Sequence, residues 1–314
     1  MRARAAGLVL GFVADRVFGD PRRGHPVAGF GQVATALERR WYADSRGRGL
    51  LYCTGLVGAA AAAGLIAERS APPAARVPLV ALATWAVLGG RSLEREALAV
   101  HGYLDRGDLP GARRRLTHLV GRDTSELDES EVSRAVIESL AENSSDAVVA
   151  PLVWGAVAGV PGLLAYRASN TLDAMVGHHN DRYERFGWAS ARLDDLVSLP
   201  GSRLSGLLTI AAVPGRGKEA WSTWRRDASA HPSPNGGVVE SAFAGSLGIR
   251  LGGVNQYYGN RVEHRAVMGS GRPARPTDIV RAAEIARRVC YGAAFVCGAV
   301  SLVRRRVKLH TSDA

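Results

Sequence analysis

Acidic side chains recur at helical spacing in one segment of the chain, DESEVSRAVIESLAENSSD. Asp128 and Glu131 open it with the spacing of a capping box, which predicts that a helix begins there. On that helix Glu138, Glu142 and Asp146 follow at intervals of four residues and share one face. Like charges at this spacing repel by roughly 0.2–0.5 kcal/mol per pair. A bound magnesium ion, a cationic group or Arg134, four residues before Glu138, would offset the repulsion, and a solvated acidic face is the alternative.

A second constellation mixes carboxylates with amides and arginines over residues 167–195, RASNTLDAMVGHHNDRYERFGWASARLDD. Asn170 and Asp173 are three residues apart on one helix face, and Asp194 and Asp195 close the segment. Carboxylates are the oxygen ligands that magnesium prefers, and arginine side chains bind phosphates and carboxylates. This mixture suits a site where a metal-bound nucleotide meets an anionic substrate. A surface network of ion pairs is the alternative.

Other features that often mark a functional site, such as histidine-containing loops, nucleotide-binding motifs and cysteine clusters, either indicate no specific chemistry or are absent from the sequence. The segments GDPRRGHP at 19–26 and HPSPNGG at 231–237 predict fixed turns because they are rich in Pro and Gly. The sequence contains no GxxxxGK[ST], GxGxxG, HExxH or GxSxG motif. Cys53, Cys290 and Cys297 lie in apolar runs without metal-ligand spacing, so we expect buried, inert thiols.

Long uncharged runs must position these residues. Residues 49–67, 147–166 and 289–303 pass without a charge, and about twenty apolar residues cross the hydrocarbon core of a bilayer. The last run stops at a basic cluster, residues 304–308, which is typical of the cytoplasmic flank of a span. The runs therefore favour a multipass membrane protein, and a soluble all-helical protein with Ala-rich core helices is the alternative.

Within this frame the sequence predicts an all-α fold, helical throughout, with a single integral membrane domain over 1–314. Pro and Gly residues interrupt the run 147–166, which favours a kinked or re-entrant element over a simple span. Either form of this element would bring its polar flanks to one site. Small residues in 54–63 and in the GAVAG stretch at 155–159 favour close packing of helices.

Charge does not indicate a nucleic-acid partner. The 314 residues carry a net charge of +11, a value that often accompanies nucleic-acid binding. However, the basic excess lies at both termini and in 216–288, whereas 91–146 and 167–195 are rich in acids. No basic helix is interleaved with aromatic residues that could stack on bases. The excess is therefore mostly membrane-flanking.

Five motifs, in order along the chain, resemble those of the CobD/CbiB family. They are GDPRRGHPV at 19–27, GRDTSELDESEVSRAVIESLAENSSDAVVAPL at 121–152, YRASNTLDAMVGHHNDRYERFGWASARLDD at 166–195, HPSPNGGVVESAFAGSLGIRLGG at 231–253, and YYGNR at 257–261. The likeness runs from about residue 7 to 300. It implies an adenosylcobinamide-phosphate synthase of cobalamin biosynthesis, multi-pass in the cell (cytoplasmic) membrane.

The resemblance implies an ATP-dependent amide ligation with Mg²⁺ as the metal. Adenosylcobyric acid would be joined to (R)-1-aminopropan-2-ol O-phosphate, or to aminopropanol, to give adenosylcobinamide phosphate. The implied partners are this corrinoid, the amine, the lipid bilayer and other membrane-associated late cobalamin enzymes, with no nucleic acid. The alternative is a non-catalytic membrane scaffold or a transporter for corrinoid intermediates. A transporter should carry ionisable residues inside its spans, and the runs 49–67 and 147–166 contain none.

The resemblance also implies roles for individual residues. The candidates for catalysis are acidic: Asp123, Glu142, Asp146, Asp173 and Asp194. The expected metal ligands are Asp173, Asp194 and Asp195. The candidates for binding substrate or nucleotide are Arg122, Asn143, Arg167, Asn170, Arg192, Asp20, His231 and Asn235.

Overall fold

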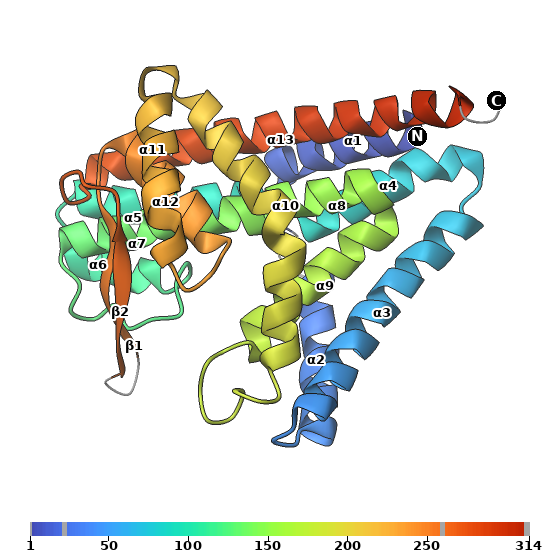
Figure 1. The fold of residues 1–314 in the computed structure, drawn as a ribbon, viewed down its shortest axis with the longest axis horizontal. Coiled ribbons are helices and arrows are strands. Elements are labelled where there is room, and N and C mark those ends of the chain that lie inside the picture. Colours follow the sequence, from blue (N-terminus) through green and yellow to red (C-terminus); the bar gives the residue numbers. More distant parts are fainter. Residues whose placement is uncertain (1, 21–23, 258–260, 311–314) are drawn as a thin grey trace. The chain divides into compact units, whose positions relative to one another are not determined.

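The computed structural model describes residues 2–20, 24–257 and 261–310, which fold almost entirely into helices (Figure 1). Two family-like motifs, GDPRRGHPV and YYGNR, therefore lie partly outside the described residues, at 21–23 and 258–260. Three helical segments are long and apolar enough to cross a membrane: Arg46–Ser70, Pro73–Asp105 and Pro276–Val303. A fourth is present if Trp188–Ala212 and Pro214–Ala230, bent by 102° at their junction, form one span. The predicted fold class, an all-α multipass membrane protein, is confirmed.

The chain forms two compact units, each assembled from separated segments. The first unit comprises Met1–Gly89, Ala150–Pro200 and Ala293–Ala314, and the second Gly90–Val149 and Gly201–Gly292. The single domain expected from the sequence stays a prediction. The helices of the first unit are α1 (Arg2–Phe18), α2 (Pro26–Trp41), α3 (Arg46–Ser70), the 3₁₀ turn η1 (Pro73–Ala75), α4 (Arg76–Val87), α8 (Ala150–Ala158), α9 (Val160–Val176), the first half of α10 (Trp188–Ala212) and the last part of α13 (Pro276–His310).

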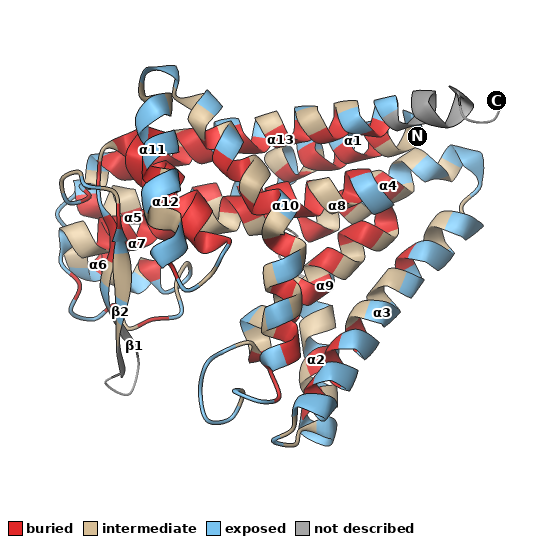
Figure 2. Ribbon diagram, viewed as in Figure 1, coloured by how far each residue is buried: buried red, intermediate tan, exposed pale blue. Residues whose placement is uncertain are grey.

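In the first unit, α1 packs on α4 and α3 packs on α9. The close approach of α3 depends on two glycines at its ends. A Cβ on Gly49 would lie 1.8 Å from the Phe186 carbonyl oxygen, and one on Gly64 would lie 2.8 Å from the Pro161 nitrogen. The small residues expected to mediate contact in 54–63 do not all do so, because Cβ atoms on the glycines of that stretch would meet open space. Much of α3 is exposed, as a lipid-facing helix requires (Figure 2).

The run 147–166 is kinked, as predicted, and it is neither one of the candidate spans nor part of the bent helix pair. A π-helical turn, η2 (Ser145–Val149), precedes α8, and α8 is separated from α9 by Gly159. Gly159 has φ 74° and ψ −148°, a conformation that is essentially restricted to glycine. A Cβ there would also lie 2.6 Å from Glu68 Oε2, so the break depends on this residue.

The core of the second unit is formed by two largely buried helices, α7 and α12. All of α12 is buried, and α7 packs against α5, α6 and α12 (Figures 1 and 2). The elements of this unit are α5 (Gly90–Asp105), α6 (Leu109–Leu116), α7 (Glu129–Ser144), η2, the second half of α10, η3 (Pro214–Arg216), α11 (Gly217–Asp227), η4 (Ala228–Ala230), α12 (Gly236–Leu247), β1 (Leu251–Tyr257), β2 (Arg261–Met268) and the first part of α13.

The expectation of helix throughout is wrong at one place. Strands β1 and β2 form an antiparallel pair, with Leu251 opposite Met268 and Val254 opposite His264. The register shifts between Leu251 and Gly253, and Gly252 and Gly253 both have positive φ. This bulge interrupts the alternation of side chains by which a strand is recognised in a sequence.

Candidate functional site

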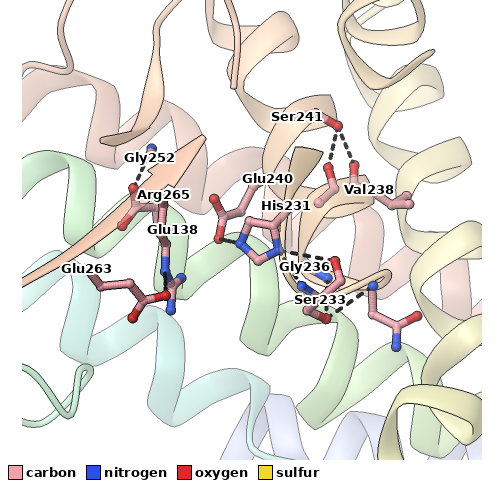
Figure 3. A network of polar contacts seen from close by, with 12 residues as sticks. Glu138, His231, Ser233, Gly236, Val238, Glu240, Ser241, Gly252, Glu263 and Arg265 are labelled. Carbon is pink, nitrogen blue, oxygen red and sulfur yellow. Dashed lines mark hydrogen bonds and ion pairs between the residues drawn. The ribbon is translucent and has the colours of Figure 1, made fainter. Parts of the chain in front are cut away.

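Three side chains of the second unit meet at one point. Glu142 lies in the last turn of α7, His231 follows η4, and Glu240 lies in α12. One potential ligand atom from each lies within 4.8 Å of the other two. His231 Nε2 is 3.5 Å from Glu240 Oε1, and the two side chains face each other in Figure 3. Residues about ninety positions apart thus form a compact set of two carboxylates and one imidazole.

Local sequence explains how His231 and α12 are brought to Glu142. His231 precedes a proline and has extended backbone, φ −78° and ψ 141°, as expected for a residue before proline. The Ser233 hydroxyl oxygen accepts hydrogen bonds from the backbone N–H groups of Asn235 and Gly236, both at 3.2 Å. A Cβ on Gly236 would lie 2.8 Å from His231 Cε1 and 3.0 Å from Glu142 Oε1. The first turn of α12 therefore reaches the cluster because residue 236 has no side chain.

Burial dominates the electrostatics of this cluster. Glu240 has 0% and His231 7% of its surface exposed. Burial raises the pKa of Glu142, and the Glu240 charge raises it further. Burial and the Glu138 charge likewise raise the pKa of Glu240, whereas burial lowers the pKa of His231. The imidazole is therefore neutral at pH 7, and the two carboxyl groups resist ionising together.

The polar atoms that face the centre of the cluster have few hydrogen-bond partners. Within the described residues, His231 Nε2 has no hydrogen-bond partner, and the oxygens of Glu240 have none besides the neighbouring carboxyl of Glu142. The outward nitrogen, His231 Nδ1, lies 3.1 Å from the Ser233 carbonyl oxygen and 3.1 Å from the Ser233 N–H nitrogen. The imidazole can therefore donate or accept at Nδ1, and either tautomer leaves Nε2 directed at the carboxylates.

Glu138, one turn before Glu142, has a different environment. Its Oε2 accepts a hydrogen bond from Arg122 Nη2 at 3.1 Å, and its Oε1 accepts one from the Gly252 N–H at 2.8 Å. Arg134 Nη1 lies 3.6 Å from Glu138 Oε1, and Arg134 donates to the carbonyl oxygens of Gly252 and, at 2.8 Å, Val254. These contacts fasten β1 to α7. Arg122, a candidate for binding substrate or nucleotide, is thus buried in an ion pair, and its binding role stays a prediction.

Three further predicted residues of this unit lie outside the cluster. Asp123 accepts a hydrogen bond at 2.9 Å from the backbone N–H of Ser125, and this bond lowers the pKa of Asp123. Asn143 donates to the carbonyl oxygen of Ser139 at 3.0 Å. Asp146 lies in the π-helical turn, so the α-helical register that aligned it with Glu142 ends before it.

Asn235 is held by α10. Its Oδ1 accepts hydrogen bonds from Ser202 Oγ and Arg203 Nη1, both at 2.8 Å. Arg203 Nη1 also donates to the carbonyl oxygen of Pro234 at 3.1 Å. Asn235 therefore fixes the loop that carries His231, which is a positioning contact next to the cluster.

The carboxylates predicted to bind metal lie in the first unit. Asp194 is buried and accepts a hydrogen bond from Ser198 Oγ at 3.4 Å, and this hydroxyl is 3.1 Å from the Tyr166 hydroxyl. Burial raises the pKa of Asp173, and the Asp195 charge raises it further. In the described part of the chain, these three carboxylates do not form a set with ligand atoms mutually within 4.8 Å. Their role in metal binding stays a prediction.

The remaining predicted residues of the first unit line α9, α10 and the loop after α1. Arg167 Nη1 donates to Asn170 Oδ1 at 3.4 Å, and both residues lie on α9. Arg192 is exposed on α10. Asp20 is half-buried and directly precedes residues 21–23, which the structure does not describe. Their binding roles stay predictions.

Two acidic residues that make important contacts in the structure, Glu240 and Glu38, are not among those singled out from the sequence. Glu240 stands alone in the apolar stretch VVESAFAGSL, and a single acid in a buried helix is the signal that could have found it. Glu38 Oε1 accepts hydrogen bonds from Arg182 Nη2 at 3.0 Å and from the Tyr183 hydroxyl at 2.9 Å. It thereby fastens the loop between α9 and α10, and nothing in the local sequence of α2 indicates this long-range contact.

Comparison with known proteins gives matches over nearly the whole chain. A family model described as "CobD/Cbib protein" matches residues 8–286. The cobalamin biosynthesis protein CobD of Mycobacterium tuberculosis is 46% identical over 308 residues, covering 97% of each chain. The protein of the same name from Rhodobacter capsulatus is 41% identical, covering 95% of this chain and 98% of the relative. That of Geobacter metallireducens is 45% identical over 88% and 90%. No solved structure matches the chain.

Proposed function

Because the chain belongs to the CobD/CbiB family, which acts in cobalamin biosynthesis, we propose that it is an ATP-dependent ligase forming adenosylcobinamide phosphate. The substrates are adenosylcobyric acid and (R)-1-aminopropan-2-ol O-phosphate, or aminopropanol itself. The observation that carries this proposal is the family match over residues 8–286, since it includes all the polar segments that hold candidate residues.

The chemistry of the proposal requires activation of a carboxylate. A carboxylate oxygen of the corrinoid takes the γ-phosphoryl group of ATP, which gives an acyl phosphate and ADP. The amine nitrogen then attacks the acyl carbon, the C–O bond to phosphate breaks, and the nitrogen loses a proton. Magnesium and arginine side chains supply positive charge that stabilises the transferring phosphoryl group.

We assign parts of this task to residues of the first unit. Asp173, Asp194 and Asp195 remain the proposed magnesium ligands, and Arg167 and Arg192 the proposed phosphate-binding residues. In favour of a metal-bound nucleotide there, burial raises the pKa of Asp173, and the neighbouring Asp195 charge raises it further. A cation would relieve both effects.

The proposed location is the cytoplasmic membrane, with several spans. The three or four candidate spans support a membrane protein, and ATP as a substrate requires that the reaction face the cytoplasm.

The test is a reaction with defined components. The purified full chain in detergent or lipid nanodiscs is incubated with adenosylcobyric acid, magnesium-ATP and each amine, and corrinoid and nucleotide products are identified by mass spectrometry. We expect amide product with stoichiometric ADP, and none when ATP or the amine is omitted. AMP in place of ADP would change the activation chemistry to an acyl adenylate.

A non-catalytic scaffold or transporter gives a different result in the same assay. It would bind the corrinoid without ATP-dependent product, and the proposed ligase activity would be abandoned. An Asp173→Asn variant that stays folded and keeps full activity would remove the proposed magnesium site alone.

A further inference from the structure

We propose that Glu142, His231 and Glu240 bind a divalent transition-metal ion of the manganese or zinc class. The three ligand atoms lie within 4.8 Å of one another and come from separate elements of the second unit. Figure 3 shows His231 and Glu240 of this set facing each other. Ligands 2.0–2.1 Å from a tetrahedral metal are about 3.3 Å apart. The 3.5 Å between His231 Nε2 and Glu240 Oε1 is close to that spacing.

The unsatisfied atoms point independently to a ligand. Glu240 is completely buried, and its oxygens have no hydrogen-bond partner among the described residues besides the neighbouring carboxyl of Glu142. His231 Nε2 is buried beside it and also lacks a hydrogen-bond partner there. Buried polar atoms in native proteins are nearly always paired, and leaving one unpaired costs about 1–3 kcal/mol. A metal ion would satisfy the acceptor atoms of both side chains at once.

Charge balance supports the same conclusion. The cluster holds two carboxyl groups and one imidazole, and Arg265 lies near both carboxyl groups while its Nε is 3.3 Å from Glu263 Oε1. Glu138 shows what a carboxylate compensated by protein groups looks like here, since Arg122 and a backbone N–H bind its two oxygens. A divalent ion bound by Glu142 and Glu240 would add positive charge to that of the neighbouring Arg265.

The imidazole decides the class of metal. Metal-bound histidines usually donate their other N–H to a carbonyl or carboxylate, and the Ser233 carbonyl oxygen lies 3.1 Å from His231 Nδ1. Magnesium prefers oxygen ligands and water, whereas zinc, manganese and iron accept mixed imidazole–carboxylate sets. The proposed ion is therefore distinct from the magnesium that accompanies ATP. The site does not depend on the proposed ligase reaction.

The experiment measures metal binding in the absence of any substrate. The full chain is purified in detergent, stripped with a chelator, and loaded with Mn²⁺ or Zn²⁺ in the presence of excess Mg²⁺. We expect one ion per chain by elemental analysis. In the Mn²⁺-loaded protein, pulsed EPR should show a ¹⁴N coupling from an imidazole. Binding of neither ion by the folded wild-type chain would overturn the proposal, whatever the ligase assay shows.

Variants assign the bound ion to the cluster. His231→Gln should abolish the ¹⁴N coupling, and Glu240→Gln should weaken binding at least about 100-fold, because even outer-shell changes cost 10–100-fold. Glu126→Gln, an exposed acid of the same unit, and Asp173→Asn should keep both the ion and the coupling. Size-exclusion chromatography and circular dichroism check that each variant is folded. An unchanged coupling in folded His231→Gln would place the ion elsewhere and refute the proposal.

Discussion

At the scale of single residues, Glu138 and Glu142 lie one turn apart on α7 and meet opposite surroundings. Glu138 is bound by Arg122 and by the N–H of Gly252, so its negative charge is compensated by the protein. Glu142 faces Glu240, and burial together with that second carboxyl raises its pKa. One helix therefore carries a carboxylate that stabilises the fold and another that costs stability unless a cation is bound.

Substitution of these two residues should therefore have opposite effects on stability. Glu138→Gln breaks the buried ion pair with Arg122, and losing one partner of such a pair costs about 3 kcal/mol or more. Glu142→Gln removes a repelling carboxyl and should leave the free energy of unfolding of the metal-free protein unchanged or increased. Chemical denaturation of chelator-treated protein, followed by circular dichroism, measures both. Equal destabilisation by the two variants would contradict the assignment of roles.

Gly236 offers a test that leaves all charges in place. Its helical backbone tolerates alanine, but a Cβ would lie 2.8 Å from His231 Cε1 and 3.0 Å from Glu142 Oε1. Gly236→Ala should therefore displace the imidazole and lower both metal affinity and ligase rate by about 10–100-fold, since small displacements of positioned groups have effects of this size. Gly215→Ala, where a Cβ meets no atom within 4 Å, is the control and should behave as wild type. Wild-type metal affinity in Gly236→Ala would argue against the cluster geometry.

At the scale of elements, local signals were predictable and tertiary ones were not. The capping box of Asp128 and Glu131 is present, because both of its hydrogen bonds lie within one turn. Asp146 could not be placed, since the π-helical turn that changes its register arises from packing rather than from residue types. Glu142 and Glu240 lie on helices that are far apart in the sequence, and the spacing of residues within either helix cannot predict that the two side chains meet. The family-like motifs include the segments that meet at the cluster, but the candidate residues predicted within them do not include Glu240.

The break at Gly159 is an element-scale feature with a measurable cost. Gly159→Ala would force a side chain into a conformation that costs about 1–3 kcal/mol and bring its Cβ against the Arg4–Glu68 ion pair. We expect Gly159→Ala to lower the unfolding temperature in detergent by an amount that corresponds to this free-energy cost. Gly58→Ala is the control, because its Cβ meets open space on α3 and alanine favours a helix by about 1 kcal/mol. If Gly159→Ala proved as stable as Gly58→Ala, the break would not depend on glycine.

At the scale of the whole molecule, the charges at the ends of α3 give its orientation in the membrane. This 25-residue helix is about 37 Å long, enough to cross a hydrocarbon core of about 30 Å. Arg39, Arg40, Arg46 and Arg48 cluster near its start, whereas its other end carries Glu68 beside Arg69. Basic residues collect on the cytoplasmic side, so the start of α3 should face the cytoplasm. The sequence alone predicted this span, because its signal is local hydropathy.

The loop between α9 and α10 should share that side with the start of α3. Within the first unit, Arg182 of this loop binds Glu38 of α2, and Gly49 of α3 approaches the carbonyl oxygen of Phe186. Asp173 lies one turn before the loop, so the proposed nucleotide-binding residues would be reached from the compartment that contains ATP. The orientation expected for α3 is therefore consistent with a reaction that takes ATP from the cytoplasm.

Single cysteines report this orientation directly. In a chain with its native cysteines replaced, Asp44→Cys and Glu184→Cys should be protected from a membrane-impermeant maleimide in intact cells and become reactive after permeabilisation. Ser70→Cys, exposed at the opposite end of α3, should react in intact cells. Labelling of Asp44→Cys and Ser70→Cys from the same face would show that α3 does not cross the membrane. Labelling of Glu184→Cys from outside would place the loop away from ATP, and Asp173 could then not hold its magnesium.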